Sequence, residues 1–445
     1  MKLFTRQLLA ITAVAATALT LAGCSGSSSD EVAAKAPAAS DLKGEITLWH
    51  HYSARESEVI TSLVDDFQAA YPGVKVKISD QQEDTKIAQV AATSSKVDVM
   101  ITNVNNTLGT LCKSMVDLQP YMDRDEVAEG DYQGIFADLT KYEDKRCSLP
   151  TTSDVYGLYY NTDLLKEAGY SEPPKTLQEL ETMALKMTTY NADGSIKTLG
   201  FNPLIGFGQV TPATLGQTAG AQWMEDGKAS VAEDPNWTGL IDWQKAFVDK
   251  IGYDKLKTFS AGAGDEWSAD NPFQTGKIAM SLDGEWRVAF IADQAKDLAY
   301  ATAPVPVLEG SGQEYGGGFA GAADIGISNK SQNKEAAWAL VKFLSHDTDA
   351  AVKYANGFKN IPTLKAAAES ADLEVPDTYR TFVDAAANPA TQSSPVTAIG
   401  GTLTQGFGSF WESYQSGDAD EKKLADGLKQ VDEDIDNALS LRGAK

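Results

Sequence analysis

The sequence predicts an α/β fold divided between two domains. With 445 residues, the chain is longer than one ordinary hydrophobic core requires, so two domains are expected. Apolar residues make up 42% and charged residues 22% of the chain, which is typical of a globular protein rather than a disordered one. Segments typical of strands alternate with segments of helical periodicity, which favours parallel strands covered by helices.

Three strands and two helices are predicted in alternation near the start of this fold. In order they are a strand at 45–49, a helix that ends before Pro72, a strand at 74–78, a helix at 85–94 and a strand at 97–102. Ser53 and Glu56 match a capping box at the start of the first helix. The apolar face of that helix consists of Val59, Ile60, Leu63, Val64, Phe67 and Tyr71.

The rest of the chain continues the mixed pattern. Strands are predicted at 156–160 and 323–328, and helices at 176–187, 235–250 and 333–345. A last helix has apolar residues at steps of three and four, at Leu424, Leu428, Val431, Ile435 and Leu439. Residues 305–306 and 357–362 are candidate crossings between the domains, because extended proline-containing segments suit hinges; ordinary loops explain them equally well.

Residues 1–23 have the features of a bacterial signal peptide. Lys2 and Arg6 precede an apolar run at 8–21 that is too short to span a membrane. The sequence Leu-Ala-Gly-Cys that ends in Cys24 resembles a bacterial lipobox, which implies cleavage before this cysteine and its modification by acyl chains such as palmitate. A plain secretory signal followed by an incidental cysteine is the alternative.

Residues 24–43 are predicted to be a lipidated, flexible tether, because they are rich in Ser, Ala, Asp and Pro. The protein is therefore expected to be lipid-anchored on the extracellular face of the cell membrane, or on the periplasmic face if the host has two membranes. Cys112 and Cys147 remain, and an exported protein with two further cysteines is expected to pair them. Two separate buried thiols are the alternative.

The charge balance argues against nucleic acid as a partner. Lys and Arg total 38 and Asp and Glu total 62, which gives a formal net charge of −24. A surface this acidic repels phosphate backbones.

Familiar catalytic and metal-binding motifs are absent from the sequence. The three histidines His50, His51 and His346 allow no H-E-x-x-H motif, and no zinc cluster of familiar spacing can be built. The glycines within 316–321 match G-x-G-x-x-G, but a strand rather than a helix follows them. We interpret them as a backbone bend, and we expect no metal and no cofactor.

Four segments together resemble the solute-binding proteins of bacterial carbohydrate ABC importers, the family that includes maltodextrin-binding proteins. They are FQAAYPGVKV at 67–76, YGLYYNTDLLKEAG at 156–169, FQTGKIAM at 273–280 with GEW at 284–286, and ISNKS at 327–331 with EAAW at 335–338. They occur in the family's order and cover nearly the whole chain after the lipobox.

The resemblance implies a two-lobed periplasmic-binding-protein fold (type II), with discontinuous lobes joined by hinge strands. It divides the chain into a first lobe of 44–153 plus 306–358 and a second lobe of 154–305 plus 359–445. The ligand would lie in the cleft between the lobes, and the partners would be the permease subunits of the importer. We expect the protein to be a monomer.

The resemblance also points to residues of the cleft. Trp286 matches the stacking tryptophan after the Gly-x-Trp turn, with a core tryptophan as the alternative. Its neighbour Glu285 is expected to take a sugar hydroxyl or to be a solvated side chain. Asp154 stands where the family has an acidic ligand-binding residue before the Tyr-Asn strand, or is a surface acid.

Further candidates follow the first and third strands. His51 and Tyr52 would face the cleft mouth, and Asn103 and Asn105 replace an aromatic contact of the family, which makes a long glucan less expected. Small residues at 399–401 stand where some relatives have another aromatic, so the cleft is expected to be wider there or filled differently. Trp223 and Trp267 lie in loops of the second lobe and are either stacking walls or packed anchors. Phe319, in the glycine-rich turn, is a further candidate.

Such residues suit a sugar, because aromatic rings cover the apolar face of a pyranose while Asp, Glu and Asn pair with its hydroxyl groups. The sequence therefore predicts a protein that binds an oligosaccharide and performs no catalysis. Three alternatives remain open: the same fold binding another solute such as a polyamine or a sugar phosphate, a secreted glycoside hydrolase, and a structural surface lipoprotein.

Overall fold

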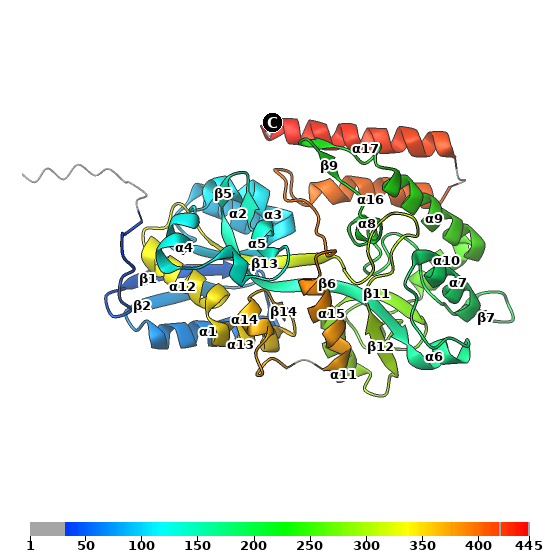
Figure 1. The fold of residues 1–445 in the computed structure, drawn as a ribbon, viewed down its shortest axis with the longest axis horizontal. Helices are drawn as coiled ribbons and strands as arrows, with labels where there is room; N and C mark the ends of the chain where they lie inside the picture. Colours follow the sequence, from blue (N-terminus) through cyan, green and yellow to red (C-terminus); the bar gives the residue numbers. More distant parts are fainter. Residues whose placement is uncertain (1–31, 375, 418–419, 444–445) are drawn as a thin grey trace, which may run out of the picture.

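The computed structural model describes residues 32–374, 376–417 and 420–443, and it consists of two lobes that lie side by side (Figure 1). The predicted two-lobed α/β architecture is confirmed. The predicted signal peptide and the lipidation site Cys24 lie outside the described residues.

The first lobe is built on three parallel strands. β1 (Gly44–His50) lies between β2 (Val74–Ser79) and β3 (Val99–Asn103). The helices α1 (Ala54–Ala70) and α2 (Asp84–Thr93) make the two connections, as predicted. Parallel neighbours require such crossover helices, because the chain must return to the same end of the sheet.

Two further strands run antiparallel and extend the sheet into the second lobe. β13 (Ala320–Ile327) pairs with β3, and β6 (Ser148–Asn161) pairs with β13. The prediction of parallel pairing is therefore correct only for the first three strands. β6 was expected at 156–160 and is 14 residues long. Its first half escaped the hydropathy pattern because buried hydroxyl residues such as Ser153, which donates to Ile361 O, form it.

The second half of β6 carries the second lobe. β11 (Met280–Gly284) and β12 (Tyr300–Ala303) pair with it, and helices surround this sheet. The helices predicted from periodicity are present as α7 (Leu177–Met187), α9 (Pro235–Ile251), α12 (Lys334–His346) and α17 (Glu421–Leu441).

The other described elements are shorter. The helices are α3 (Val104–Leu111), η1 (Cys112–Ser114), α4 (Gln119–Asp125), η2 (Glu129–Asp131), α5 (Phe136–Leu139), α6 (Thr162–Glu167), α8 (Pro212–Ala219), α10 (Tyr253–Ala261), α11 (Trp286–Gln294), α13 (Thr348–Phe358), α14 (Lys365–Ala368), α15 (Asp377–Ala387) and α16 (Thr402–Gln415). The strands are β4 (Lys141–Tyr142), β5 (Lys145–Arg146), β7 (Thr189–Tyr190), β8 (Ile196–Thr198), β9 (Met224–Glu225), β10 (Lys228–Ala229) and β14 (Ile361–Pro362).

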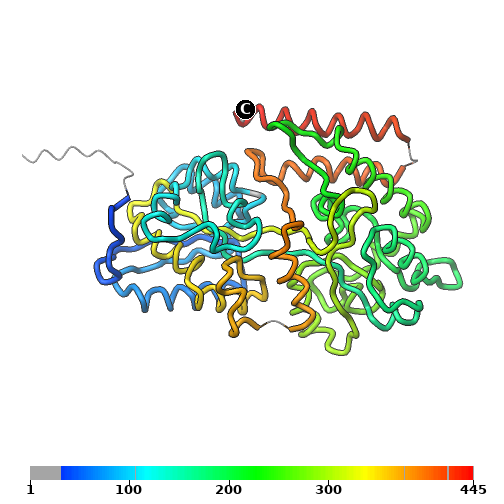
Figure 2. Tube along the Cα trace, in the orientation of Figure 1, coloured from blue at the N-terminus to red at the C-terminus, as the bar shows by residue number. Residues whose placement is uncertain are grey.

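Hydrogen bonds and hydrophobic packing show where the chain crosses between the lobes. Val307 N donates to Lys175 O and Leu308 N donates to Thr218 O, which are second-lobe residues, so the chain crosses along β13 rather than at 305–306. Leu364 and Ala367 pack in the first-lobe cluster, so the predicted crossing at 357–362 is displaced to the segment between α14 and α15. Figure 2 shows β6 and β13 passing between the lobes. The predicted boundaries missed these positions because proline marks extended chain but not the core against which it packs.

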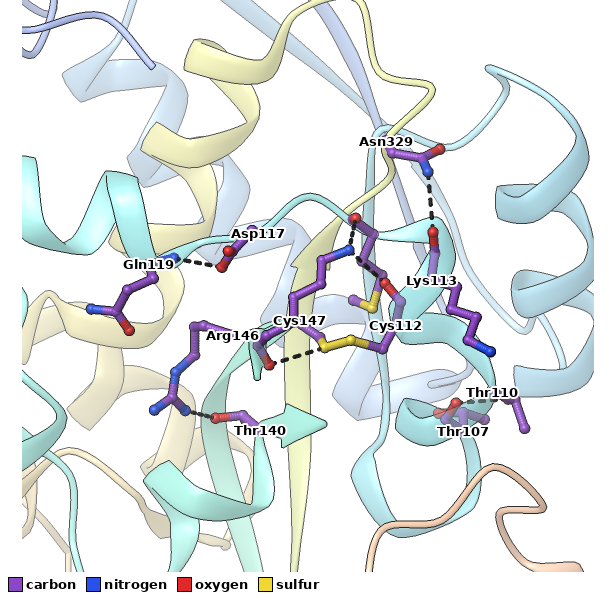
Figure 3. The surroundings of a disulfide bond; sticks show 12 residues. Thr107, Thr110, Cys112, Lys113, Asp117, Gln119, Thr140, Arg146, Cys147 and Asn329 are labelled. Carbon is purple, nitrogen blue, oxygen red and sulfur yellow. Dashed lines mark hydrogen bonds between the residues drawn. A yellow bond between two sulfur atoms is a disulfide. The ribbon is translucent and has the colours of Figure 1, made fainter. Parts of the chain in front are cut away.

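The structure contains the expected disulfide between Cys112 and Cys147, whose Cα atoms are 5.3 Å apart (Figure 3). It joins the end of α3 to the residue before β6. Lys145 Nζ also donates to Cys112 O at 2.8 Å. Cross-linking a loop of this length stabilises a fold by about 3 to 4 kcal/mol in the chain-entropy model.

Two local predictions near the N-terminus are wrong. The tether was expected to reach residue 43, but Leu42 is buried in the first-lobe cluster and Val32 packs against it. Ser53 is the N-cap residue of α1, but its side chain makes no capping hydrogen bond. Ala54 has a φ of +46°, and this sharp turn places Ser53 and Glu56 on a hollow between the lobes instead.

Candidate functional site

The carboxyl ends of β1 and β3 place polar side chains on the cleft between the lobes. His51 follows β1, and its Nδ1 lies 3.0 Å from Asp84 Oδ1. Burial lowers the pKa of His51, but the hydrogen bond and the charge of Asp84 outweigh this effect, so the pKa lies above its ordinary value. Asn103 ends β3, and its backbone N donates to Asp84 Oδ2 at 3.3 Å.

The largest hollow of the cleft has a volume of about 1110 Å³. First-lobe residues of α2 and α3 line one side, and Ile399, Gly401 and Gln405 line the other, with Arg442 at the end of α17. The small residues expected to widen the cleft near 399–401 therefore do face it. A hollow of this size accommodates a ligand of several sugar units, since sites for drug-sized molecules span roughly 300 to 1000 Å³.

A smaller hollow of about 170 Å³ adjoins the first at Gly401 and reaches the connecting strands. Asn103, Asn105, Asp154 and Phe319 line it, so four predicted residues meet here. The two lobes also touch at this point, because Asn105 Nδ2 donates to Ser393 Oγ and Ser394 O at 2.8 and 2.9 Å. A Cβ atom on Gly109 would lie 2.0 Å from Thr397 O, so glycine permits this close approach of α3.

Four aromatic rings, which we call the aromatic row, lie in a continuous chain of contacts beside Asp154. The ring centroids are 6.1 Å apart for Trp267 and Trp286, 5.3 Å for Trp286 and Tyr156, and 5.2 Å for Tyr156 and Phe319. Trp267 is 51% exposed, so this end of the row is open to solvent. Aromatic surface of this kind suits the apolar faces of successive sugar rings.

The backbone at Gly284 positions Trp286. A Cβ atom at residue 284 would come within 2.2 Å of the Trp286 ring, so glycine is required for the ring to lie where it does. Trp286 is partly buried and belongs to the aromatic row rather than to the core of the second lobe.

A third hollow, of about 330 Å³, lies between the start of α1 and α11. Arg55 and Glu56 line its first-lobe side, and Phe290 and Asp293 line its second-lobe side. Phe290 lies 5.7 Å from Trp267, so this hollow adjoins the open end of the aromatic row.

Five predicted site residues do not line these hollows. Trp267 and Trp286 adjoin them only through ring contacts, because Trp286 packs against Tyr156 and Trp267 packs against Phe290. The other three lie elsewhere. Trp223 is 4% exposed and packs edge-to-face against Trp237 at 4.7 Å, so it is a packed anchor. Tyr52 packs edge-to-face against Phe358 at 4.7 Å and lies against the first-lobe cluster. Glu285 has no exposed surface, which contradicts both the expected sugar contact and the solvated side chain.

Glu285 is buried behind Asp154. Its Oε2 accepts a hydrogen bond from Val155 N at 2.7 Å, and its Oε1 accepts one from Asn360 Nδ2. Burial and the nearby charge of Asp154 raise the pKa of Glu285 well above its usual range. Burial and the charge of Glu56 raise the pKa of Asp154 to about 6.

Sequence reasoning missed Tyr156, Asp84 and Glu56. Tyr156 stands two residues after Asp154 on β6, and residues i and i+2 of a strand face the same side, so the period of two could have identified it. Asp84 is the first residue of α2 and no motif marks it, and Glu56 was assigned to a capping box.

Within the described residues, no group of three His, Cys, Asp or Glu side chains is placed to hold a metal ion. None of the described helices is both long and apolar enough to cross a membrane.

Hollows between two lobes that combine polar side chains with aromatic rings are typical of proteins that surround a small ligand. Residues 53–351 match the sequence model of the family of bacterial extracellular solute-binding proteins, and the chain belongs to this family. The family predicted from the sequence is therefore confirmed.

Relatives of known name are distant in sequence. The maltotriose-binding protein of Pyrococcus abyssi (strain GE5 / Orsay) is 22% identical over 326 residues, which cover 72% of this chain and 67% of that protein. A maltooligosaccharide ABC transporter solute-binding lipoprotein of Streptococcus pneumoniae is 29% identical over 223 residues, 47% of this chain and 49% of that protein. The structure of CpMnBP1 with mannotriose bound has a TM-score of 0.74 and 23% identity, covering 87% of this chain and 100% of that one.

Proposed function

We propose that this protein captures an oligosaccharide in the cleft and delivers it unchanged to the permease subunits of an ABC importer. The observation that carries the proposal is the small hollow between the lobes, where the rings of Tyr156 and Phe319 meet the polar side chains Asn103, Asn105 and Asp154. Relatives named for maltotriose and maltooligosaccharides, and a similar structure with mannotriose, support a ligand of a few sugar units.

Capture works by closure of the two lobes on the ligand. The crossings along β6, along β13 and between α14 and α15 are the hinge, and a sugar that touches both walls stabilises the closed form. Moving a population from mostly open to mostly closed requires the closed form to bind about 10⁴-fold more tightly, or about 5.5 kcal/mol.

The remaining features of the proposal concern location and assembly. Cleavage before Cys24 and acylation of this residue would hold the protein on the outer face of the membrane. The protein would act as a monomer. The lobes would be 44–153 plus 320–368 and 154–319 plus 377–445, adjusted from the sequence-based boundaries by the hydrogen bonds of Val307 and Leu308 and the packing of Leu364. The cleft would release its ligand without breaking any bond.

Calorimetric titration of the soluble domain with maltose, maltotriose, mannobiose and mannotriose tests the proposal. We expect one of these saccharides to bind with a change in tryptophan fluorescence and a smaller radius of gyration in solution scattering. The Trp223→Phe variant is the matched control, because Trp223 lies in the core and away from the cleft. The proposal would be overturned if neither these saccharides nor longer ones bound to the protein, or if hydrolysis products appeared.

A further inference from the structure

Three polar side chains from three separate segments meet behind the small hollow, and we call them the hinge triad. Asp154 lies on β6, Glu285 immediately precedes α11, and Asn360 lies between α13 and β14. Asn360 Nδ2 donates to Asp154 Oδ1 and to Glu285 Oε1, at 2.5 and 2.9 Å. An amide nitrogen carries two hydrogens, so it can serve both carboxyl groups at once.

The two carboxyl groups of the triad have different surroundings. Asp154 is partly exposed and lines the 170 Å³ hollow, whereas Glu285 is completely buried. Glu285 also accepts a hydrogen bond from Val155 N, the residue after Asp154. Among the described residues no hydrogen bond is made to Asp154 Oδ2, while Asp154 itself lines the hollow.

Other titratable and charged groups surround the triad on every side. Those near the carboxyl groups are Glu56 on α1, His51 and Tyr52 after β1, Asp283 with its partner Arg287 at β11 and α11, Tyr156 on β6, Tyr354 on α13 and Tyr379 on α15. A hollow of about 360 Å³ lies on the other side of Asn360, and its charged lining residues are Arg55, Asp293, Lys359 and Glu374.

We propose that Asn360 is a positioning residue of the ligand site, which holds the Asp154 carboxylate toward the cleft and ties it through Glu285 to both lobes. The inference rests on the proposed function only in assigning a ligand contact to Asp154. Asn360 belongs to the first-lobe segment after α13, and Glu285 belongs to the second lobe. The orientation of Asp154 therefore depends on both lobes, and the amide must be retained for the site to accept a ligand hydroxyl.

The triad is tested first without ligand, by infrared titration of the carboxyl groups in the whole soluble domain. The Asp154→Asn variant identifies the band of Asp154. In the wild-type protein the hydrogen bond from Asn360 stabilises the charged form of Asp154 and lowers its pKa. Because Asn360→Ala removes this hydrogen bond, the titration midpoint of Asp154 is expected to move to higher pH. The control is Asn356→Ala, on the same helix end, since Asn356 Nδ2 donates to Asp372 O and not to the triad. An unchanged midpoint in Asn360→Ala would overturn the inference.

The second test measures affinity for maltotriose and mannotriose by calorimetry between about pH 5 and pH 8. Asn360→Ala is expected to weaken binding about tenfold near pH 8, because a hydrogen bond to a charged group is lost. The pH at which affinity changes is also expected to rise. Asn356→Ala should match the wild-type protein. Asn360→Ser keeps one donor and gives an intermediate result, and it replaces the alanine variant if that does not fold.

The outcomes separate the two proposals. Equal affinity and equal pH dependence in Asn360→Ala and the wild-type protein would contradict the positioning role. If the wild-type protein binds no saccharide, the proposed function fails, while the infrared titration still decides whether the triad exists as described.

Discussion

The two walls of the cleft differ in chemistry and in how the chain builds them. The first-lobe wall is polar, with His51 and Asn103 at the ends of parallel strands and Asp84 at the start of α2. The opposite wall has small and apolar residues at Ile399 and Gly401, and it is aromatic at the small hollow, where Tyr156 lies with Trp286 packed behind it. Polar side chains at strand ends are positioned by the backbone of the sheet. Aromatic rings keep their orientation only when other side chains of the lobe pack against them.

The difference assigns separate roles to the walls in the proposed function. Aromatic rings bury the C–H face of a sugar and contribute affinity through area. Hydrogen-bonding groups select the arrangement of hydroxyls, because an unmatched buried polar group costs more than a matched one contributes. Substitutions on the two walls should therefore differ in the size and kind of their effect.

The largest effect is expected for an aromatic residue that lies outside both walls. Trp223→Ala should lower the free energy of unfolding by about 3 to 5 kcal/mol, because it leaves a cavity beside Trp237 and Phe407. Denaturant unfolding measures this loss. Saccharide affinity of the folded fraction should stay near the wild-type value, and a large loss of affinity at full folding would place Trp223 in the site.

Trp286→Ala removes the centre of the aromatic row and should weaken saccharide binding by about 2 kcal/mol, roughly 30-fold, through lost apolar contact. Calorimetry measures the affinity, and Trp286→Phe should recover part of it. Wild-type affinity in the alanine variant would show that the row does not contact the ligand.

Asn105→Ala tests the direct contact between the walls. It removes the hydrogen bonds from Asn105 to Ser393 Oγ and Ser394 O. Their loss should shift the equilibrium toward the more open form by about 1 kcal/mol, or roughly fivefold. Solution scattering of the ligand-free protein should show a larger radius of gyration. No change in scattering would mean that these hydrogen bonds do not hold the lobes together.

The smallest effect concerns the polar wall and depends on pH. Asp84 raises the pKa of His51 above 6.5, so their interaction stabilises the fold below that pH and is lost as the pH rises through the higher folded value. Asp84→Asn should therefore destabilise the protein more at low pH than at pH 8, by less than about 1 kcal/mol, since His51 is partly exposed. NMR titration of His51 should show a lower pKa; an unchanged value would argue against the pair.

Local signals in the sequence predicted many of the elements and part of the site. Periodicity and flanking glycine or proline placed α1, α9 and α17 within a few residues, because these signals depend on neighbouring residues alone. Asp154 and Trp286 were found through motifs that resemble those of the family. Cys112 and Cys147 were paired because few cysteines were available.

Tertiary structure decided what depends on partners distant in the sequence. Glu285 and Trp223 are of residue types that are common in sugar-binding sites. They do not line the cleft, because Glu285 is buried against Val155 and Asn360 and Trp223 is buried against Trp237. The crossings at β13 and after α14 follow from which core receives each segment, and hydropathy alone does not distinguish the two cores. The sequence by itself therefore determined the class of protein and its local elements, whereas only packing decided which side chains line the cleft.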